Sequence, residues 1–153
     1  MSYASPEIHT LDRPSIDALL SRNSVGRIAF TYGGRVDVQP IHYVYNGGWI
    51  YGRTSAGSKL RSVLHNCWVA FEVDEVEDVF RWRSAIVHGA CYVLDPEGSP
   101  HEREVYEQAV TLMRRLIPET LTDADPVPSR TALFRVHVDE ATGREAGEAR
   151  GRA

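Results

Sequence analysis

The sequence has few cysteines, no long hydrophobic run and no excess of basic residues. Its two cysteines, Cys67 and Cys91, are too few for a disulfide framework or a four-cysteine zinc site, so we expect both thiols to be reduced and buried. No apolar stretch approaches the roughly 18 to 20 residues of a membrane-spanning helix. The first six residues lack the basic and then apolar order of a secretory signal, which predicts a cytoplasmic protein with no membrane partner.

The charge balance is mildly acidic, with 17 Lys and Arg residues, 21 Asp and Glu residues and a formal net charge of -4. This balance argues against a nucleic-acid partner but leaves room for a small basic pocket that binds an anionic small molecule. Hydrophobic residues make up 42% of the 153 residues, as in ordinary globular proteins. We expect one domain over residues 1–142 and a flexible polar tail over 143–153.

Apolar residues that alternate with polar ones predict the first three strands. These strands cover residues 25–32, 35–45 and 49–54. Gly33-Gly34 and Asn46-Gly47-Gly48 supply the tight turns between them, so the three strands form a meander and not a βαβ unit. Pro40 cannot donate a hydrogen bond to a neighbouring strand, so we expect the second strand to lie at an edge or to bulge there.

Three further strands and three helices complete the predicted pattern. The strands are expected around residues 69–73, over 82–94 and over 131–139. The helices are expected from Asp12 to about Asn23, after Ser58 through Leu64, and from Gly98 to Pro118, with a surface loop over 119–130. The sum is a mainly β protein whose six antiparallel strands close into a small barrel with flanking helices.

The segment Tyr51–Leu60 is a candidate phosphate site. A strand ends there in hydroxyl and basic residues, and a helix begins with Lys59 in its first turn. Backbone N–H groups at a helix start, together with a nearby cation, favour a phosphate. The segment is not a nucleotide-triphosphate loop, because no hydroxyl residue follows the lysine. The alternative is that Thr54 or Ser55 only caps the helix and Lys59 is a solvated surface charge.

Two other segments carry possible binding groups. In Val38–His42, the proline frees neighbouring backbone groups to meet a flat polar ligand such as a flavin ring; the alternative is an ordinary edge strand with a half-buried His42. In Arg81–Ser84, Trp82 offers a stacking surface and the arginines bind an anion; the alternatives are an oligomer interface or a core tryptophan. His65 and Cys67 lack a second pair of ligands, so no metal site is expected, and no catalytic residue is assigned.

These segments, in this order and spacing, resemble the pyridoxamine 5'-phosphate oxidase-like, FMN-binding split-barrel proteins. The resemblance is carried by residues 26–30, 38–43, 51–60, 82–84 and 88–89. It covers residues 12 to 95 well and favours the small flavin-nucleotide-binding and nitroimidazole-resistance-like branch. It implies a six-stranded antiparallel split β-barrel that forms a homodimer, with one FMN in each of two clefts between the subunits.

The resemblance also implies which residues hold the cofactor. Those matched to the FMN phosphate are Arg53, Thr54, Ser58 and Lys59, and those along the ring are Gln39, Pro40, Ile41 and His42. Ser84 falls where the oxidase has a glutamine that touches the flavin. Trp82 comes from the same strand and is expected to reach the cofactor of the other subunit.

The aromatic residues give a second reason to expect a homodimer. Six short strands leave sheet edges and aromatic surface, including Trp49, Trp68 and Trp82, that one chain does not cover. A two-fold interface would bury this surface and enclose the ligand.

Two departures from the family narrow the expected function. After His137 the chain lacks the Arg- and His-containing segment that grips pyridoxal phosphate, so vitamin B6 oxidation is not expected. The histidine that the nitroimidazole-reductase branch carries near Gly52 and Arg53 is also missing. The resemblance implies an FMN-dependent oxidoreductase of a small-molecule substrate with a nicotinamide electron donor, or alternatively a non-catalytic module that binds flavin, deazaflavin or haem.

Overall fold

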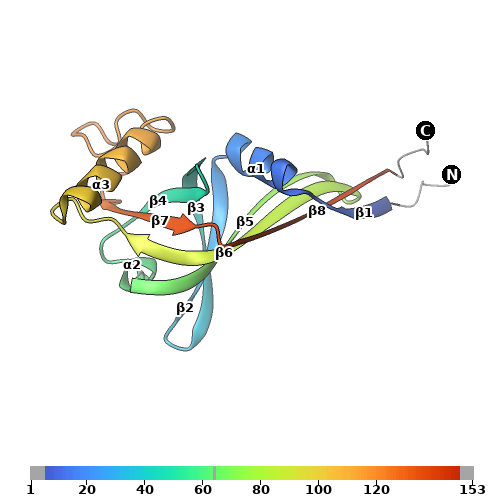
Figure 1. Ribbon diagram of the computed structural model, residues 1–153, viewed down its shortest axis with the longest axis horizontal. Helices are drawn as coiled ribbons and strands as arrows, with labels where there is room; N and C mark the ends of the chain where they lie inside the picture. The colour runs from blue at the N-terminus through green and yellow to red at the C-terminus, as the bar shows by residue number, and fades with distance from the viewer. Residues whose placement is uncertain (1–5, 64, 149–153) are drawn as a thin grey trace.

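The computed structural model describes residues 6–63 and 65–148, which form a β sheet flanked by three helices (Figure 1). In chain order the elements are β1 (Pro6–Thr10), α1 (Arg13–Arg22), β2 (Val25–Tyr32), β3 (Arg35–Asn46), β4 (Trp49–Thr54), α2 (Lys59–Val63), β5 (His65–Asp78), β6 (Arg81–Val93), α3 (Pro100–Met113), β7 (Ala132–His137) and β8 (Glu140–Glu148). Paired strands in this part of the chain are antiparallel. The predicted mainly β, antiparallel class is therefore confirmed.

The six predicted strands close a ring. Their order is β6-β5-β2-β3-β4-β7, and pairing of β7 with β6 joins the two ends. Outside the ring, β8 pairs with β6 and β1 pairs with β8, so the described residues form eight strands instead of the six expected. β1, β8 and the 74–84 hairpin of β5 and β6 form an arm that extends away from the barrel (Figure 1).

A bulge joins the barrel to this arm. Along β6, Cys91 lies opposite Val136 of β7 and His88 lies opposite Glu140 of β8. Cys91 and His88 are three positions apart on β6, whereas Val136 and Glu140 are four positions apart. The chain that links β7 to β8 therefore carries one extra residue opposite β6. Gly89 sits at this point, where an added Cβ would lie 1.6 Å from the last carbonyl oxygen of β7. Only glycine therefore fits without moving the backbone.

The structure confirms the first predicted helix and its cause. The Asp12 carboxylate caps α1 by accepting a hydrogen bond from the Ser15 N–H at 2.9 Å. The buried face of the helix consists of Ile16, Leu19 and Leu20, which join the main core of the barrel. Burial of this apolar stripe attaches α1 to the sheet.

The predicted glycine turns are also confirmed. Gly33 and Gly34 have φ angles of 55° and 75°, and Gly47 and Gly48 have φ angles of 58° and 81°. These left-handed conformations are the ones that two-residue hairpins require and that glycine adopts without steric cost. The meander from β2 to β4 therefore follows directly from the sequence.

Pro40 lies at an open edge, as one of the two alternatives predicted. It pairs with Arg27 of β2, whereas β4 pairs with β3 only from Tyr43 to Asn46. The register of β3 on β2 continues through Pro40 without a shift, so the alternative of a bulge is wrong.

Two predicted helices are shorter than expected. α2 ends at Val63, and Leu64 lies outside the described residues. α3 ends at Met113 instead of continuing to Pro118, because the chain tightens there: the N–H of Leu116 bonds to the Met113 carbonyl, three residues back. From this turn Leu116 packs against an apolar cluster between α3 and the strands β4 and β7.

The expected flexible tail is wrong for residues 143–148. These residues belong to β8, which pairs with both β6 and β1 and crosses the expected domain boundary at residue 142. The polar segment contains few apolar residues of its own, and its order comes from pairing with the free edge of β6. Residues 149–153 of the predicted tail lie outside the described part of the chain.

The described residues form two apolar cores. The larger one fills the barrel beneath α1, and the smaller one lies between α3 and the strands β4 and β7. Both cysteines are free thiols, Cys91 buried and Cys67 half-buried, and burial raises the pKa of each. No helix among the described residues is long and apolar enough to cross a membrane, and residues 6–63 and 65–148 contain no cluster of three potential metal ligands.

Candidate functional site

The loop between β4 and α2 brings two hydroxyl groups together. The Thr54 and Ser58 hydroxyl oxygens lie 2.9 Å apart, and Ser58 Oγ accepts a hydrogen bond from the Arg61 N–H at 3.0 Å. Ser58 is therefore the cap of α2, so the alternative in which Thr54 or Ser55 caps this helix is wrong. Since α2 has only five residues, the hydroxyls and Lys59, more than any helix dipole, define this site.

The Lys59 side chain reaches across to the β2–β3 hairpin. Its Nζ lies 3.6 Å from Asp37 Oδ2 and 5.7 Å from the centre of the Tyr32 ring, and 60% of the side chain is exposed. The sequence did not single out Asp37 or Tyr32, because only the folded hairpin places them near α2. This contact brings the predicted phosphate segment next to the predicted ring segment of β3.

Arg53 makes a different set of contacts from Thr54 and Ser58. Its guanidinium forms a buried bidentate ion pair with Asp125, with N···O distances of 2.6 and 2.8 Å. The pair holds the pKa of Asp125 well below its usual range. Successive side chains of a strand point to opposite faces, so Arg53 faces the 119–130 loop while Thr54 faces α2. We assign Arg53 to that loop and not to a phosphate.

Asp125 also organises the loop that it closes. Its carboxylate accepts hydrogen bonds from the backbone N–H groups of Leu121 and Val127 at 2.8 and 3.0 Å. Arg53 and Asp125 are 72 residues apart in the sequence, and no local pattern connects them. Sequence reasoning therefore missed the most buried ion pair of the described residues.

The four predicted ring residues divide between the two faces of β3. Ile41 is buried in the main core and Gln39 is half-buried, whereas Pro40 and His42 are exposed on the opposite face. The interpretation of His42 as a half-buried, hydrogen-bonded residue is therefore wrong. Pro40 and His42 are the ones that can meet a ligand on the outside of the sheet.

Trp82 and Ser84 lie on the arm, far from Lys59 in the same chain. Ser84 pairs with Asp74, near the end of β5, whereas α2 leads into the start of β5 at His65. Nine positions of extended strand separate His65 from Asp74, which corresponds to about 30 Å. The predicted site residues thus form two separate groups within one chain.

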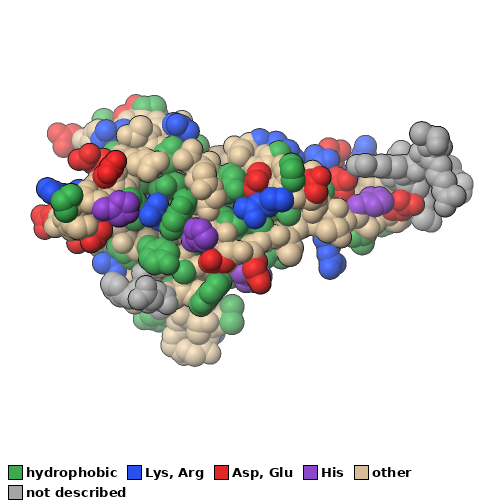
Figure 2. All heavy atoms as spheres, in the orientation of Figure 1, with side chains coloured by type: hydrophobic (Ala, Val, Ile, Leu, Met, Phe, Trp, Pro, Cys, Tyr) green, Lys and Arg blue, Asp and Glu red, His purple; other side chains and the backbone are tan. Residues whose placement is uncertain are grey.

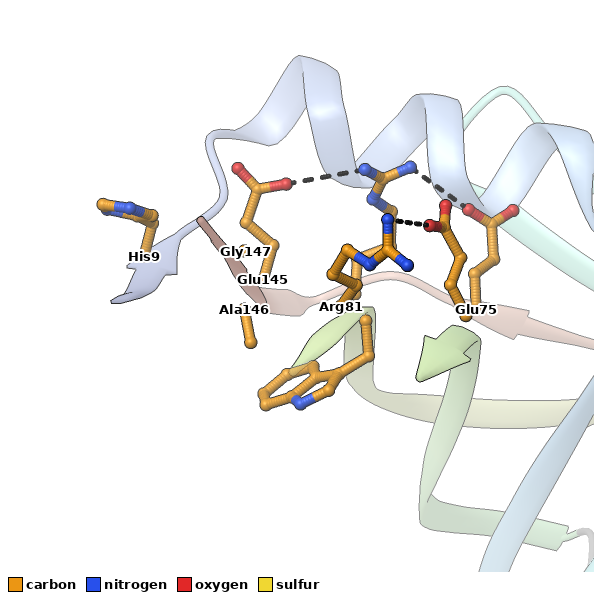
Figure 3. A pocket seen from close by; sticks show the side chains of 9 residues that line it. His9, Glu75, Arg81, Glu145, Ala146 and Gly147 are labelled. Atoms are coloured by element: carbon orange, nitrogen blue, oxygen red, sulfur yellow. Dashed lines mark ion pairs between the residues drawn. The ribbon is translucent and has the colours of Figure 1, made fainter. Parts of the chain in front are cut away.

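A hollow of about 230 Å³ surrounds Trp82 on the arm. Arg83 lies between two carboxylates there, 3.6 Å from Glu75 and 3.8 Å from Glu145. Figure 3 labels these two glutamates and marks their ion pairs with dashed lines. Hydrogen bonds from Arg22 and Asn23 to Glu75 lower the pKa of its carboxyl to about 2. Among the described residues, Arg81 and Arg83 of this hollow are both paired with carboxylates, so the hollow is a network of ion pairs and does not favour an added anion.

The outside of strands β2, β3, β5 and β6 carries an exposed apolar surface, which we call the outer face. Its exposed apolar residues include Val36, Val38, Trp68 and Ile86, with exposed fractions of 83%, 59%, 66% and 40%. Small residues continue this surface across the sheet, because Val38 lies opposite Ala29 and Ala29 lies opposite Ala70. Figure 2 shows part of it as hydrophobic side chains on β5 and β6, below α3.

The three tryptophans differ in exposure. Trp68 stands on the outer face, while Trp49 and Trp82 are half-buried. Trp49 contacts the rings of Tyr92 and His137 with centroid distances of 6.0 and 4.8 Å. The predicted aromatic surface therefore exists chiefly at Trp68.

Comparison with known proteins identifies similar chains. The family model for pyridoxamine 5'-phosphate oxidase matches residues 12–145. An FAD-binding protein from Mesorhizobium loti has 26% sequence identity and a TM-score of 0.72, over 92% of this chain and 99% of that chain. This similarity confirms the split-barrel fold.

Two further structures share the fold. A conserved protein of unknown function from Corynebacterium diphtheriae has 29% identity and a TM-score of 0.67, over 90% of this chain and 97% of that chain. An FAD and heme binding protein from Mycobacterium smegmatis has 20% identity and a TM-score of 0.68, over 94% of this chain and 76% of that chain. No curated protein matches the sequence.

Proposed function

Because the chain belongs to the pyridoxamine 5'-phosphate oxidase family, we propose that it binds FMN and is an oxidoreductase acting on a small molecule, with a nicotinamide electron donor. The observation that carries this proposal is the position of the Lys59 ammonium beside an exposed apolar sheet face. FMN has the two matching parts, an anionic phosphate and a flat ring. The FAD-binding protein from Mesorhizobium loti supports a flavin as the ligand class.

The residues around α2 fit a phosphate group. Thr54 and Ser58 offer two hydroxyls 2.9 Å apart, and Lys59 offers an exposed ammonium. The distance of 3.6 Å to Asp37 is long for an ion pair, so a phosphate of about -1.5 to -2 charge competes well for the same ammonium. Arg53 is left out of this proposal because Asp125 occupies its guanidinium.

The outer face next to Pro40 and His42 fits the ring. Both residues are exposed, and β4 does not cover the edge of β3 at this point. When bound, the flavin supplies hydride and electron transfer. The chain's residues then hold the ring and keep water from one side of it.

We also propose that the functional unit is a homodimer that pairs through the outer face. Exposed apolar side chains as large as Trp68 and as numerous as those on this face are typical of an interface. The arm places Trp82 and Ser84 about 30 Å from α2 along the strand, too far to reach a flavin bound at Lys59 of the same chain. In a dimer, the flavin would instead meet Trp82 of the partner subunit.

A non-catalytic haem- or flavin-binding module is the second candidate. His42 and His88 are both exposed on the outer face, and imidazole is an axial ligand of haem. The Mycobacterium smegmatis neighbour binds both FAD and heme. An absorption spectrum of the purified chain separates the candidates, because flavin and haem absorb at different wavelengths and only a flavin oxidoreductase is bleached by a nicotinamide donor.

Lys59 allows a sharp test of the phosphate site because it is the only lysine of the sequence. Lys59→Ala should weaken FMN binding by about 1.5 to 3 kcal/mol, roughly 10- to 100-fold, and should leave riboflavin binding unchanged. Arg61→Ala removes a positive charge from the same helix and should retain full affinity. Equal affinities of the wild-type chain for FMN and riboflavin would contradict the site.

Chemical labelling gives an independent readout of the same site. An amine-reactive reagent modifies Lys59, and mass spectrometry quantifies the modified peptide. Saturating FMN should protect Lys59 severalfold, whereas riboflavin should not. Labelling that is unchanged by FMN would show that the ammonium does not contact the phosphate.

The outer face is tested by a charge placed at its centre. Val38→Asp should produce a monomer in sedimentation and lose FMN binding, because Val38 is exposed in the single chain and the core is untouched. Val79→Asp is the matched control, since Val79 is even more exposed but lies at the tip of the β5–β6 hairpin. A wild-type monomer that binds FMN stoichiometrically would overturn the shared cleft.

A further inference from the structure

A second hollow of about 230 Å³ lies between α3 and the ends of β6 and β7, where no role has been assigned. Leu94 and Val105 form its buried apolar part, together with the half-buried Arg135 of β7. Exposed side chains, among them Asp95 and Glu102, stand at its opening. It therefore has one apolar and basic end and one acidic end.

Arg135 is the unexplained group in this hollow. Its guanidinium carbon lies 3.6 Å from the centre of the Trp49 ring, so the ring covers one face of the guanidinium. Its Nε is buried and has no hydrogen-bond partner among the described residues. The covered Nε is not the atom that a ligand would reach, but the guanidinium as a whole makes no ion pair among the described residues and lines the hollow, so its remaining N–H groups favour a ligand that brings an oxygen anion. A carboxylate matches the planar edge of a guanidinium.

The side chains at the opening of the hollow favour a positively charged group, whereas Arg135 favours a negatively charged one. Asp95 uses one carboxylate oxygen to accept a hydrogen bond from the Glu97 N–H at 2.8 Å, which leaves the other oxygen available. Glu102, in the first turn of α3, adds a second carboxylate, and His101 lies beside it. These carboxylates repel a plain anion and favour a ligand that carries an amine at this end.

We propose that this hollow binds a small zwitterion with an apolar body, of the chemical class of an apolar α-amino acid. Its carboxylate would meet Arg135, its hydrocarbon part would lie on Leu94 and Val105, and its ammonium would face Glu102. The volume is below the roughly 300 to 1,000 Å³ of pockets for drug-sized ligands, which agrees with a ligand of this size. The site uses neither Lys59 nor the outer face near β3, so it is independent of the proposed flavin site.

Three probes separate the two ends of the ligand. L-phenylalanine carries both charged groups, 3-phenylpropionate lacks the amine, and phenethylamine lacks the carboxylate. Titration of the full chain by calorimetry should give saturable binding of phenylalanine, with each truncated probe bound at least about tenfold more weakly. Stronger binding of phenylpropionate than of phenylalanine would overturn the zwitterion assignment.

Two variants with a control assign the binding to this hollow. Arg135→Gln should weaken phenylalanine and phenylpropionate about 10- to 100-fold, and the exposed Glu102→Gln should weaken only the two probes that carry an amine. Arg103→Gln removes a charge from α3 outside the hollow and should bind like the wild type. The proposal is overturned if none of the probes saturates the wild-type chain, or if Glu102→Gln, which keeps the fold intact, binds all three probes unchanged.

Discussion

The barrel and the arm are held together by different forces. The barrel surrounds an apolar core in which Ile28, Phe71 and Val87 have no exposed surface. The arm instead relies on ion pairs: the Glu75 carboxylate lies 2.7 Å from the Arg22 guanidinium and 3.6 Å from the Arg83 guanidinium. Apolar burial supplies most of the stability of a domain, whereas partly exposed ion pairs supply about 0 to 1 kcal/mol each. The arm should therefore open more easily than the barrel.

The difference explains why the sequence predicts one region and not the other. A barrel strand carries its own alternation of apolar and polar residues, and this pattern is visible locally. The strands β1 and β8 carry little such pattern, because pairing with neighbouring strands orders them. A strand that is ordered mainly by pairing with other strands is therefore hard to predict from its own sequence.

Arg53→Ala should have the largest effect, and it acts on the barrel. Removing one partner of a buried ion pair leaves the Asp125 carboxylate buried without its partner and releases the loop that it organises. Breaking a buried ion pair in this way costs about 3 to 5 kcal/mol of unfolding free energy, which corresponds to a fall in Tm of about 10 °C for a chain of this size. Differential scanning calorimetry checks this, with the exposed Arg103→Ala as a control that keeps Tm within about 1 °C. A small shift for Arg53→Ala would mean that Asp125 finds another partner.

Gly89→Ala should have the next effect, and it acts on the junction of the two regions. The new methyl group would overlap the β7 backbone, so the bulge between β7 and β8 must move. We expect a loss of about 1 to 3 kcal/mol of unfolding free energy. Gly57→Ala is the matched control, since no atom lies within 4 Å of its added Cβ and its φ is not in the left-handed region. Hydrogen exchange should show faster exchange in both β7 and β8; a change confined to β8 would mean that the barrel closes without this junction.

Glu75→Gln should weaken the arm alone. The amide cannot keep the charged contacts with Arg22 and Arg83, so residues 140–148 should exchange their amide hydrogens faster while β4 remains protected. The expected loss is about 1 kcal/mol, because these side chains are partly exposed. Glu77→Gln is the control, because the exposed Glu77 side chain lies 4.0 Å from Arg81 and makes at most a weak ion pair. Equal protection of the arm in both variants would contradict the role of Glu75.

Acid should reveal the smallest difference between the two regions. The pKa of Glu75 is lowered from 4.5 to about 2, so its contribution to stability is complete above about pH 4.5 and is lost as the pH falls towards 2. Hydrogen exchange of the arm should therefore accelerate over this range. Glu75→Gln should flatten that dependence, and an unchanged acid profile would show that other carboxylates hold the arm.

The candidate site follows the same division. Thr54, Ser58 and Lys59 lie close together in the sequence, and the structure keeps them together. The family resemblance groups Arg53 with them, but the alternation of side chains along β4 turns Arg53 to the other face, towards Asp125. The positions of Asp125 and Arg135 depend on contacts across the fold, which no spacing in the sequence reveals. The hairpin glycines, by contrast, determine their turns from their own conformational freedom.

The strands β7 and β8, joined by the bulge, are the last strands of the sheet to be synthesised. The segment from Ala132 to Glu148 completes the edge of β6 along both of its halves and closes the ring against β4. During translation this segment leaves the ribosome after all the other strands. Until then the edges of β4 and β6 remain unpaired. Open edges pair readily with foreign strands, and the nascent chain should therefore depend on chaperones until residue 148 has emerged.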